Sequence, residues 1–275
     1  MKILLTGARG QLGQALLPAL AGHDVVALGS RELDIAELDA ARAAVEGARA
    51  DLVINCAAWT DVDGAEADPA GAFRANAVGP RNLALAARSA GAALLQLSSD
   101  YVFDGTSGRA YCEFDATNPL SVYGRSKLAG EDAVRTFLER HFVVRTAWLL
   151  SGRGRNFALA MRAQAGRPEV RVVADQFGSP TYAPHLARAI ATLVESEAWG
   201  TYHLAGAGCA SWYELACALY RALGVATPVR PVATSEFPRP APRPRYAPLA
   251  TVQSPRIELP AWQEGVAELA RDIAT

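Results

Sequence analysis

The sequence predicts an α/β fold, a doubly wound parallel sheet with a smaller C-terminal lobe interleaved with it. Through the first half of the chain, short apolar runs alternate with longer segments of helical pattern. The runs are apolar throughout instead of alternating with polar residues, which indicates strands buried on both faces. Alternation of such strands with helices specifies a sheet that is covered by helices on each side.

The elements follow one another regularly up to residue 150. The predicted strands have the sequences KILLT, DVVAL, DLVINCA, ALLQLSS and FVVRTAWLL, at 2–6, 24–28, 51–57, 93–99 and 142–150. The predicted helices cover 11–20, 37–45 and 73–90, and a fourth contains Tyr123 and Lys127. Beyond residue 150 this rhythm breaks, so we expect the rest of the chain to form the smaller lobe.

Composition and charge exclude several classes of function. A formal net charge of -1 gives no polybasic signature, so the sequence does not support a role at nucleic acid or at a membrane surface. No apolar run approaches the roughly 18 residues that a membrane span needs. The start, MKILLTGARG, is unlike a signal peptide because its apolar run leads straight into glycines. The four cysteines show no CxxC pair or zinc spacing, so we expect free thiols in a reducing cytoplasm.

A glycine-rich turn, TGARGQLG, lies between the first strand and the first helix. Its Gly7, Gly10 and Gly13 suit a tight turn, a close approach of a pyrophosphate to the backbone, and close packing of helix against sheet. Structural turns also use glycine, but the position inside a strand–helix–strand unit favours dinucleotide binding. The spacing is similar to that of extended short-chain dehydrogenase/reductases, which have a Rossmann-type fold.

The glycine turn and the break after residue 150 predict two lobes. We expect a dinucleotide-binding domain over 1–146, with 184–205 packing back onto it. A substrate-binding lobe is expected over 147–183 and 206–275. In it, SWYELACALYRALG predicts a helix that begins with a Ser N-cap and ends at a Gly. FPRPAPRPRYAP has Pro at alternating positions, which favours an extended, mobile connection.

The end of the second strand, VVALGSREL, bears on the choice of cofactor. A carboxylate at this tip would hold the adenine ribose 2′-hydroxyl of NAD. The position falls near Gly29, Ser30 and Arg31, where no carboxylate stands. We therefore predict NADPH, with Arg31 meeting the 2′-phosphate. A solvated loop cation is the alternative for Arg31, and use of NADH fits as well.

Ser99, Tyr123 and Lys127 together indicate ketone reduction. A phenol can deliver a proton to the ketone oxygen if a nearby ammonium lowers its pKa from about 10. Tyr123 and Lys127 are four residues apart, on one face of a helix. Ser99 ends the fourth predicted strand, at the edge where such sheets bind ligands. Lys2 and Lys127 are the only lysines among 27 Lys and Arg residues.

Each of these residues also has a purely structural interpretation. Tyr123 could pack as an ordinary aromatic, Ser99 could cap a turn, and Lys127 could be a solvated charge. The three residues fit one reaction, in chain order with the glycine turn, so we favour a reductase.

The chain resembles dTDP-4-dehydrorhamnose reductases, extended short-chain dehydrogenase/reductases that complete the synthesis of dTDP-L-rhamnose. The resemblance rests on KILLTGARGQLG, NCAAWTDVDGAEADP, SSDYVFDG, YGRSKLAGE, VRTAWLLSGRGRNF, DQFGSPT and ELPAWQEGV, which together span nearly all of the sequence. It implies reduction of the C4 ketone of dTDP-4-dehydro-L-rhamnose by NADPH, for polysaccharide biosynthesis. Tyr123 would protonate the C4 oxygen, Lys127 would tune the phenol, and Ser99 would hold the carbonyl.

The resemblance also implies two sets of binding residues. The cofactor set is Gly7, Arg9, Gly10, Gln11, Leu12, Ser30, Arg31, Asp34, Ile35, Asn55, Ala57, Ala58, Thr60, Tyr123 and Lys127. The substrate set is Asp100, Tyr101, Trp148, Asn156, Phe157, Gln176, Gly178 and Thr181. Core burial is the alternative for Trp148, and a structural turn is the alternative for Asp100 and Tyr101. Some family members hold Mg²⁺ at a homodimer interface, but the sequence shows no cluster of ligands, and we predict no metal site.

One stretch departs from the family pattern. Where the family has RPxxSxLD, this chain has RPRYAPLA, with Ala247 and Ala250 in place of polar residues. This departure puts the sugar nucleotide in question more than the reduction. The alternatives are another dTDP-deoxysugar C4 ketoreductase, an epimerase, or a non-catalytic NADP-binding subunit similar to the β-subunit of methionine adenosyltransferase.

Overall fold

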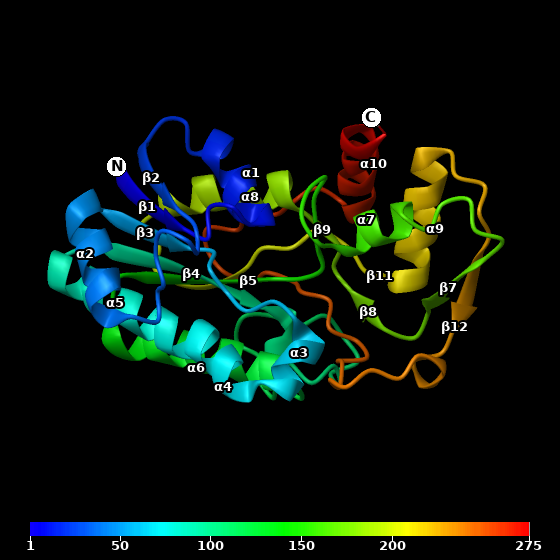
Figure 1. The fold of residues 1–275 in the computed structure, drawn as a ribbon, viewed down its shortest axis with the longest axis horizontal. Coiled ribbons are helices and arrows are strands. Elements are labelled where there is room, and N and C mark those ends of the chain that lie inside the picture. Colours follow the sequence, from blue (N-terminus) through cyan, green and yellow to red (C-terminus); the bar gives the residue numbers. More distant parts are fainter. Residues whose placement is uncertain (275) are drawn as a thin grey trace.

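A six-stranded parallel sheet forms the centre of the larger lobe (Figure 1). The computed structural model describes residues 1–274. The strands are β1 (Lys2–Thr6), β2 (Asp24–Leu28), β3 (Leu52–Asn55), β4 (Ala93–Ser99), β5 (His141–Thr146) and β10 (Gly200–His203). Their spatial order is β10-β5-β4-β3-β1-β2, and every neighbouring pair is parallel. The predicted α/β fold is confirmed.

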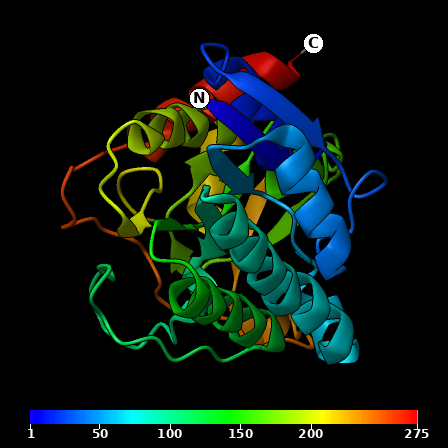
Figure 2. The ribbon, with the colours of Figure 1, turned by 90° about the vertical axis from the view of Figure 1, so that its left-hand side faces the viewer.

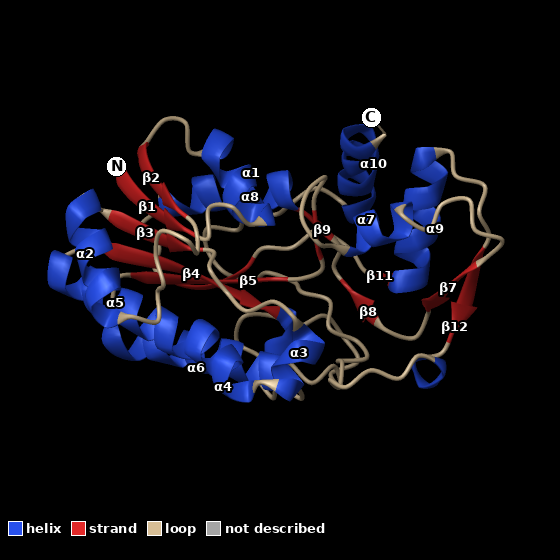
Figure 3. Ribbon diagram, in the orientation of Figure 1, coloured by secondary structure: helices blue, strands red, loops and turns tan. Residues whose placement is uncertain are grey.

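Helices cover both faces of this sheet (Figure 3). On one face lie α1 (Gln11–Ala19) and α8 (Ala183–Val194), and on the other lie α2 (Leu38–Ala48), α5 (Gly79–Ala90) and α6 (Val122–Phe137). Ile3 and Leu5 of β1 pack towards α1 and α8, whereas Leu4 packs towards α2 and α5. Burial of both sets of side chains explains why the strands are apolar without alternation.

The helix predicted over 73–90 is interrupted. It divides into α4 (Pro69–Phe73), a π-helical segment (Arg74–Val78) and α5, and the short helix α3 (Val62–Ala67) precedes it. Figure 2 shows α5 and α6 side by side. The Cβ of any larger residue at Gly130 of α6 would lie 2.1 Å from the Asn76 carbonyl oxygen, so α6 approaches the π segment closely. Such segments occur often at functional sites.

The smaller lobe has its own core. Its elements are β6 (Leu149–Leu150), α7 (Phe157–Arg162), β7 (Val170–Val173), β8 (Phe177–Gly178), β9 (Thr181–Tyr182), β11 (Ala210–Ser211), α9 (Trp212–Leu223), β12 (Val229–Val232) and α10 (Trp262–Ile273), with a 3₁₀ turn at Thr234–Glu236. Another 3₁₀ turn, Asp100–Val102, follows β4 in the larger lobe. Leu215, Leu219 and Leu269 are among the side chains buried between α9 and α10. As predicted, α9 begins with a Ser cap, since the Ser211 hydroxyl accepts from the Glu214 N–H at 3.1 Å, and it ends at Gly224.

No helix among residues 1–274 combines the length and the apolar character that crossing a membrane requires.

Candidate active site

The glycine turn after β1 has the geometry of an anion cradle. Gly7 has φ 65°, and a Cβ there would lie 2.5 Å from the Ala57 nitrogen. A Cβ at Gly13 would lie 2.4 Å from the Gly7 carbonyl oxygen, so α1 packs directly on the turn. The Gly10 N-cap of α1 carries no capping side chain. The first N–H groups of the helix therefore face the carboxyl edge of the sheet, where a pyrophosphate would bind.

A carboxylate lies at the tip of β2, contrary to the sequence analysis. The chain turns back after Leu28, and the Glu32 N–H donates to the Gly29 carbonyl at 3.1 Å. This turn brings the Glu32 carboxylate onto the Gly29 N–H, at 2.9 Å, where it also forms an ion pair with Arg9. The sequence analysis missed this carboxylate because it counted residues along an extended strand. In the structure the turn after β2 folds the Glu32 side chain back to the tip of the strand. Ser30 and Arg31 are exposed beside this pair.

The other predicted cofactor residues lie around the same edge with different accessibility. Asp34 is exposed and pairs with Arg74 at 2.7 Å, and this hydrogen bond lowers the pKa of the Asp34 carboxyl. Asn55 is fully buried, and its Oδ1 accepts from the Thr6 hydroxyl at 2.5 Å and from the Ala57 N–H at 3.1 Å. Asn55 therefore shapes the loop instead of presenting a free side chain. Leu12 and Ile35 are buried, Ala57 and Ala58 are half-buried, and Thr60 is exposed.

Gln11 connects the glycine turn to loop 151–156 of the smaller lobe, which contains Arg153 and Arg155. Its Nε2 donates to the Arg155 carbonyl at 3.1 Å, and its Oε1 accepts from the Ser151 hydroxyl at 2.9 Å. The loop 151–156 thus lies across the N-terminus of α1.

The structure brings Ser99, Tyr123 and Lys127 together at the carboxyl end of β4. Ser99 ends β4, and Tyr123 lies in the first turn of α6, whose N-cap Ser121 accepts from the Gly124 N–H at 3.1 Å. A Cβ at Gly124 would lie 2.2 Å from the Tyr101 carbonyl oxygen, so α6 packs tightly on the turn after β4. The Tyr123 phenol consequently lies beside the Ser99 side chain.

The charge states of the pair differ from the sequence prediction. Burial raises the pKa of the Tyr123 phenol to about 12, with no lowering by Lys127. Lys127 is 4% exposed, its Nζ donates to the Leu97 carbonyl at 2.7 Å, and burial lowers its pKa to about 8. Near neutral pH the phenol is therefore protonated and the ammonium is charged. A protonated phenol is the state that a proton donor requires.

Asp100 is a second titratable group of this site. Its carboxyl is buried, and its Oδ1 accepts from the Ser99 hydroxyl at 2.9 Å. Burial raises the pKa of Asp100 to about 7, although the Ser99 hydrogen bond acts in the opposite direction. Its ionisation therefore decides to which group the Ser99 hydroxyl donates.

A cavity of about 350 Å³ lies beside this group of residues, within the size range of ligand sites. Tyr101 connects the two, because its ring meets the Tyr123 ring edge-on at a centroid distance of 5.4 Å. Three predicted substrate residues line the cavity: Tyr101, Phe157 and Gln176. The residues that sequence reasoning missed are Ala160, Met161, Gln164, Arg171, Val172, Val173, Trp212, Phe237, Arg239 and Arg243. The cavity thus combines aromatic surface with three guanidinium groups.

Comparison with known proteins identifies the family. The family described as RmlD substrate binding domain matches residues 1–275. The dTDP-4-dehydrorhamnose reductase of Streptomyces griseus is 47% identical over 255 residues, which cover 89% of this chain and 84% of the relative. This chain belongs to the dTDP-4-dehydrorhamnose reductase family.

Two solved structures of the family agree with this fold. A dTDP-4-dehydrorhamnose reductase from Clostridium acetobutylicum superposes with a TM-score of 0.97 at 39% identity, covering 100% of both chains. The reductase from Bacillus anthracis, solved in complex with NADP, has a TM-score of 0.95 at 37% identity and covers 98% of this chain and 99% of that one. The resemblance seen in the motifs is confirmed, and the chain is an oxidoreductase of this family.

The two alanines that depart from the family pattern lie outside the cavity. Ala247 is buried among Val102, Phe103 and Tyr111, and its N–H donates to the Phe177 carbonyl at 3.0 Å. Ala250 donates its N–H to the Tyr111 carbonyl at 2.8 Å. Both residues therefore fix the backbone of the segment, and neither methyl group lines the cavity where a sugar nucleotide would contact it.

Four other residues predicted to bind substrate shape the walls of the smaller lobe. Trp148 stacks on Trp212 with ring centroids 3.5 Å apart, and a Cβ at Gly178 would lie 2.5 Å from the Trp148 ring. Thr181 is fully buried, and its hydroxyl donates to the Ser179 carbonyl at 3.0 Å. Asn156 caps α7 by accepting from the Leu159 N–H at 3.1 Å. Their direct contact with substrate stays a prediction.

Asn76 is a polar residue that sequence reasoning missed. It is buried in the π segment, and its Nδ2 donates to the Ser126 hydroxyl of α6 at 2.9 Å. Its amide also exchanges hydrogen bonds with the backbone of Trp59, at 2.9 and 3.0 Å. Asn76 thus joins α6 to the loop after β3. The surrounding stretch is partly exposed, so a polar residue there is ordinary and the local sequence carried no signal of its role.

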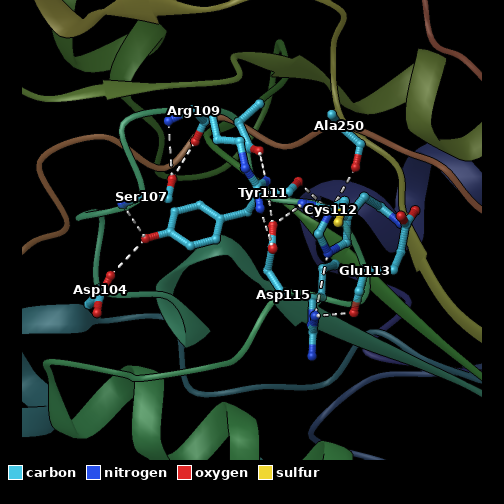
Figure 4. Close-up of polar contacts among 11 residues, drawn as sticks. Asp104, Ser107, Arg109, Tyr111, Cys112, Glu113, Asp115 and Ala250 are labelled. Carbon is cyan, nitrogen blue, oxygen red and sulfur yellow. Dashed lines mark hydrogen bonds and ion pairs between the residues drawn. The ribbon is translucent and has the colours of Figure 1, made fainter.

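The loop between β4 and α6 is held by polar contacts (Figure 4). The Tyr111 hydroxyl donates to Asp104 at 2.7 Å, and Arg109 forms a two-pronged ion pair with Asp115 at 2.6 and 2.8 Å. Glu113 accepts from the His203 N–H at 2.9 Å, which ties the loop to β10. These contacts hold the segment that leads into the N-terminus of α6.

Within residues 1–274, no group of three or more His, Cys, Asp or Glu side chains is arranged to hold a metal ion.

Proposed function

We propose that this chain reduces the C4 ketone of dTDP-4-dehydro-L-rhamnose to give dTDP-L-rhamnose, with NADPH as reductant. The observation that carries the proposal is the meeting of Ser99, Tyr123 and Lys127 at the carboxyl edge of the sheet, beside a cavity lined by aromatic and guanidinium groups. Family membership supports the substrate, and the intact trio argues against a non-catalytic subunit. The cavity suits the base and the diphosphate of a nucleotide sugar.

The residues around the glycine turn fit a dinucleotide. Gly7 and Gly13 leave no room for a Cβ, and the uncapped N-terminus of α1 can meet the pyrophosphate. Arg9 lies in the glycine turn, and its side chain, which reaches the tip of β2, can meet a 2′-phosphate. The bound NADPH supplies the hydride for the ketone carbon.

The proton follows a path through this chain's own residues. Ser99 donates a hydrogen bond to the ketone oxygen and orients it, and Tyr123 transfers its phenolic proton to that oxygen. The Lys127 ammonium places a positive charge in the same buried site, although it does not lower the pKa of the phenol in the protein alone. Each group is held by neighbours, Ser99 by the end of β4 and Lys127 by the Leu97 carbonyl, so the geometry is set before substrate binds.

The activity test measures NADPH oxidation with enzymatically generated dTDP-4-dehydro-L-rhamnose. We expect turnover with formation of dTDP-L-rhamnose. An enzyme that binds NADPH but gives no turnover would contradict the proposed reaction. Parallel assays with other dTDP-4-keto-6-deoxysugars would show whether a different ketoreductase activity dominates, and tightly bound NAD in purified protein would indicate an epimerase.

The reduction is expected to slow as the pH rises through about 7, the raised pKa of Asp100. Protonated Asp100 can donate to Ser99, which leaves the Ser99 hydrogen for the ketone, whereas ionised Asp100 accepts that hydrogen. Asp100→Asn cannot ionise and should lose this decline in kcat/KM. A decline near pH 8, from Lys127, should persist in the variant. An unchanged pH profile in Asp100→Asn would contradict this role.

Glu32 is expected to lower the preference for NADPH, because it neutralises Arg9 at the position where the 2′-phosphate binds. Glu32→Gln should lower the KM for NADPH relative to NADH by about two- to fivefold, the range for an exposed ion pair worth up to about 1 kcal/mol. Arg9→Gln and Arg31→Ala should have the opposite effect and raise the KM for NADPH relative to that for NADH. Steady-state KM values for both cofactors test this, and equal shifts for the two cofactors would refute it.

A further inference from the structure

The Pro–Arg strap, residues 237–246, crosses from the smaller lobe to the larger one. Four prolines at alternating positions keep it extended, as predicted, but it is anchored along its length instead of being a free connection. In Figure 1 the orange strap runs from the end of β12 to the neighbourhood of α3. A Cβ at Gly105 would lie 2.6 Å from the Arg245 nitrogen, so the strap also packs closely on the loop after β4.

One carboxylate of the larger lobe holds the middle of this strap. Asp63, in α3, accepts from Arg243 Nη1 at 3.0 Å and from Arg243 Nη2 at 2.9 Å. It also accepts from Arg239 Nη1 at 3.1 Å and from the Ala241 N–H at 3.2 Å. Both carboxylate oxygens are thus engaged by a single segment that lies about 180 positions further along the chain.

The two arginines are held to different degrees. Arg243 is 18% exposed, forms the two-pronged contact with Asp63, and lies beside the Tyr101 phenol. Arg239 gives Asp63 one N–H, and its side chain is 52% exposed. Both line the cavity beside Tyr123. Two guanidinium groups against one carboxylate leave a net positive charge there, with the free donors of Arg239 available to an anion.

We propose that Asp63 is a positioning residue that presents Arg239 and Arg243 to the diphosphate of the nucleotide sugar. The inference rests on the proposed function for its ligand and adds a residue that does not itself touch the reacting atoms. Asp63 orders the strap and its guanidinium groups before substrate binds, which lowers the entropy lost on binding. Through Arg243 and Tyr101 it also connects diphosphate recognition to the wall of the catalytic group.

The test measures dTDP binding by calorimetry and steady-state kinetics with the sugar nucleotide. Asp63→Asn should weaken dTDP binding about tenfold and raise the KM of the sugar nucleotide similarly. The kcat should change by less than about threefold, because Tyr123, Ser99 and Lys127 are untouched. The affinity for NADPH should be unchanged, since Asp63 has no contact with the glycine turn. Asp63→Glu, which keeps a carboxylate, should recover part of the lost affinity.

Asp61→Asn is the matched control, because Asp61 lies on the same helix but caps its N-terminus and has no contact with the strap. It should keep wild-type affinity for dTDP. If Asp63→Asn binds dTDP as well as or better than the wild type, Asp63 competes for the arginines and the inference is wrong. Failure of the wild type to bind dTDP would also overturn it. Binding of dTDP that depends on Asp63 but without turnover would instead contradict the proposed reaction alone.

Discussion

Tyr123→Phe is expected to lower kcat for ketone reduction by about 10²- to 10⁴-fold, the range for loss of a positioned general acid. The phenol is buried, protonated near neutral pH and beside Ser99, so it is placed to donate to the oxygen that Ser99 would hold. The aromatic ring is retained in Phe, and its edge-on contact with Tyr101 should persist. The measurement is single-turnover NADPH oxidation with saturating sugar nucleotide, together with NADPH affinity, which should change little.

Tyr101→Phe is the comparison variant for this experiment. It removes the neighbouring phenol, which contacts Arg243, but leaves the donor in place. We expect its effect to fall mainly on the KM of the sugar nucleotide and to be much smaller on kcat. If Tyr123→Phe keeps near wild-type turnover, or if both variants lose the same factor in kcat, Tyr123 is not the proton donor.

The fold, and the meeting of Ser99, Tyr123 and Lys127 at one edge of the sheet, were predictable because their signals are local. Continuous apolar strands, a glycine turn after the first of them, and a Tyr–Lys pair four residues apart each lie within about ten residues of sequence. The topology of the sheet then determines which of these segments meet. In a parallel sheet the carboxyl ends of the strands share one edge, so Ser99 at the end of β4 must lie near the glycine turn after β1.

The residues that were missed depend on contacts that are distant in sequence or on side-chain direction. Asp63 and Arg243 are 180 positions apart, and no pattern in the sequence around either residue predicts their contact. Glu32 lies four residues beyond β2 and reaches its tip only because the backbone reverses. The segment Arg74–Val78 has the composition of an ordinary helix, and nothing in that composition indicates its π form or its close packing against α6.

Lys127 is expected to tolerate no other residue, including Arg. Its ammonium is 4% exposed and donates to the single Leu97 carbonyl, a space that suits a compact head and not a planar guanidinium. Lys127→Arg and Lys127→Met should each lower kcat by at least about 10²-fold. Retention of turnover by Lys127→Arg would show that any cation suffices there, and would contradict this argument.

The same burial predicts how stability changes with pH. The folded-state pKa of Lys127 is lowered to about 8 from 10.5, so the folded chain binds its proton less tightly than the unfolded chain. Below about pH 8 the folded chain holds the buried ammonium, and the full cost of burying it lowers the free energy of unfolding. This cost disappears as the pH rises towards 10.5, because the folded chain loses the proton first. Relative to Lys127→Met, the wild type should therefore gain about 2 kcal/mol between about pH 7 and pH 10. Denaturant unfolding of both proteins at the two pH values measures this difference. A constant difference would mean that the ammonium is not buried at a cost, and that this lysine is not held in the site at the expense of stability.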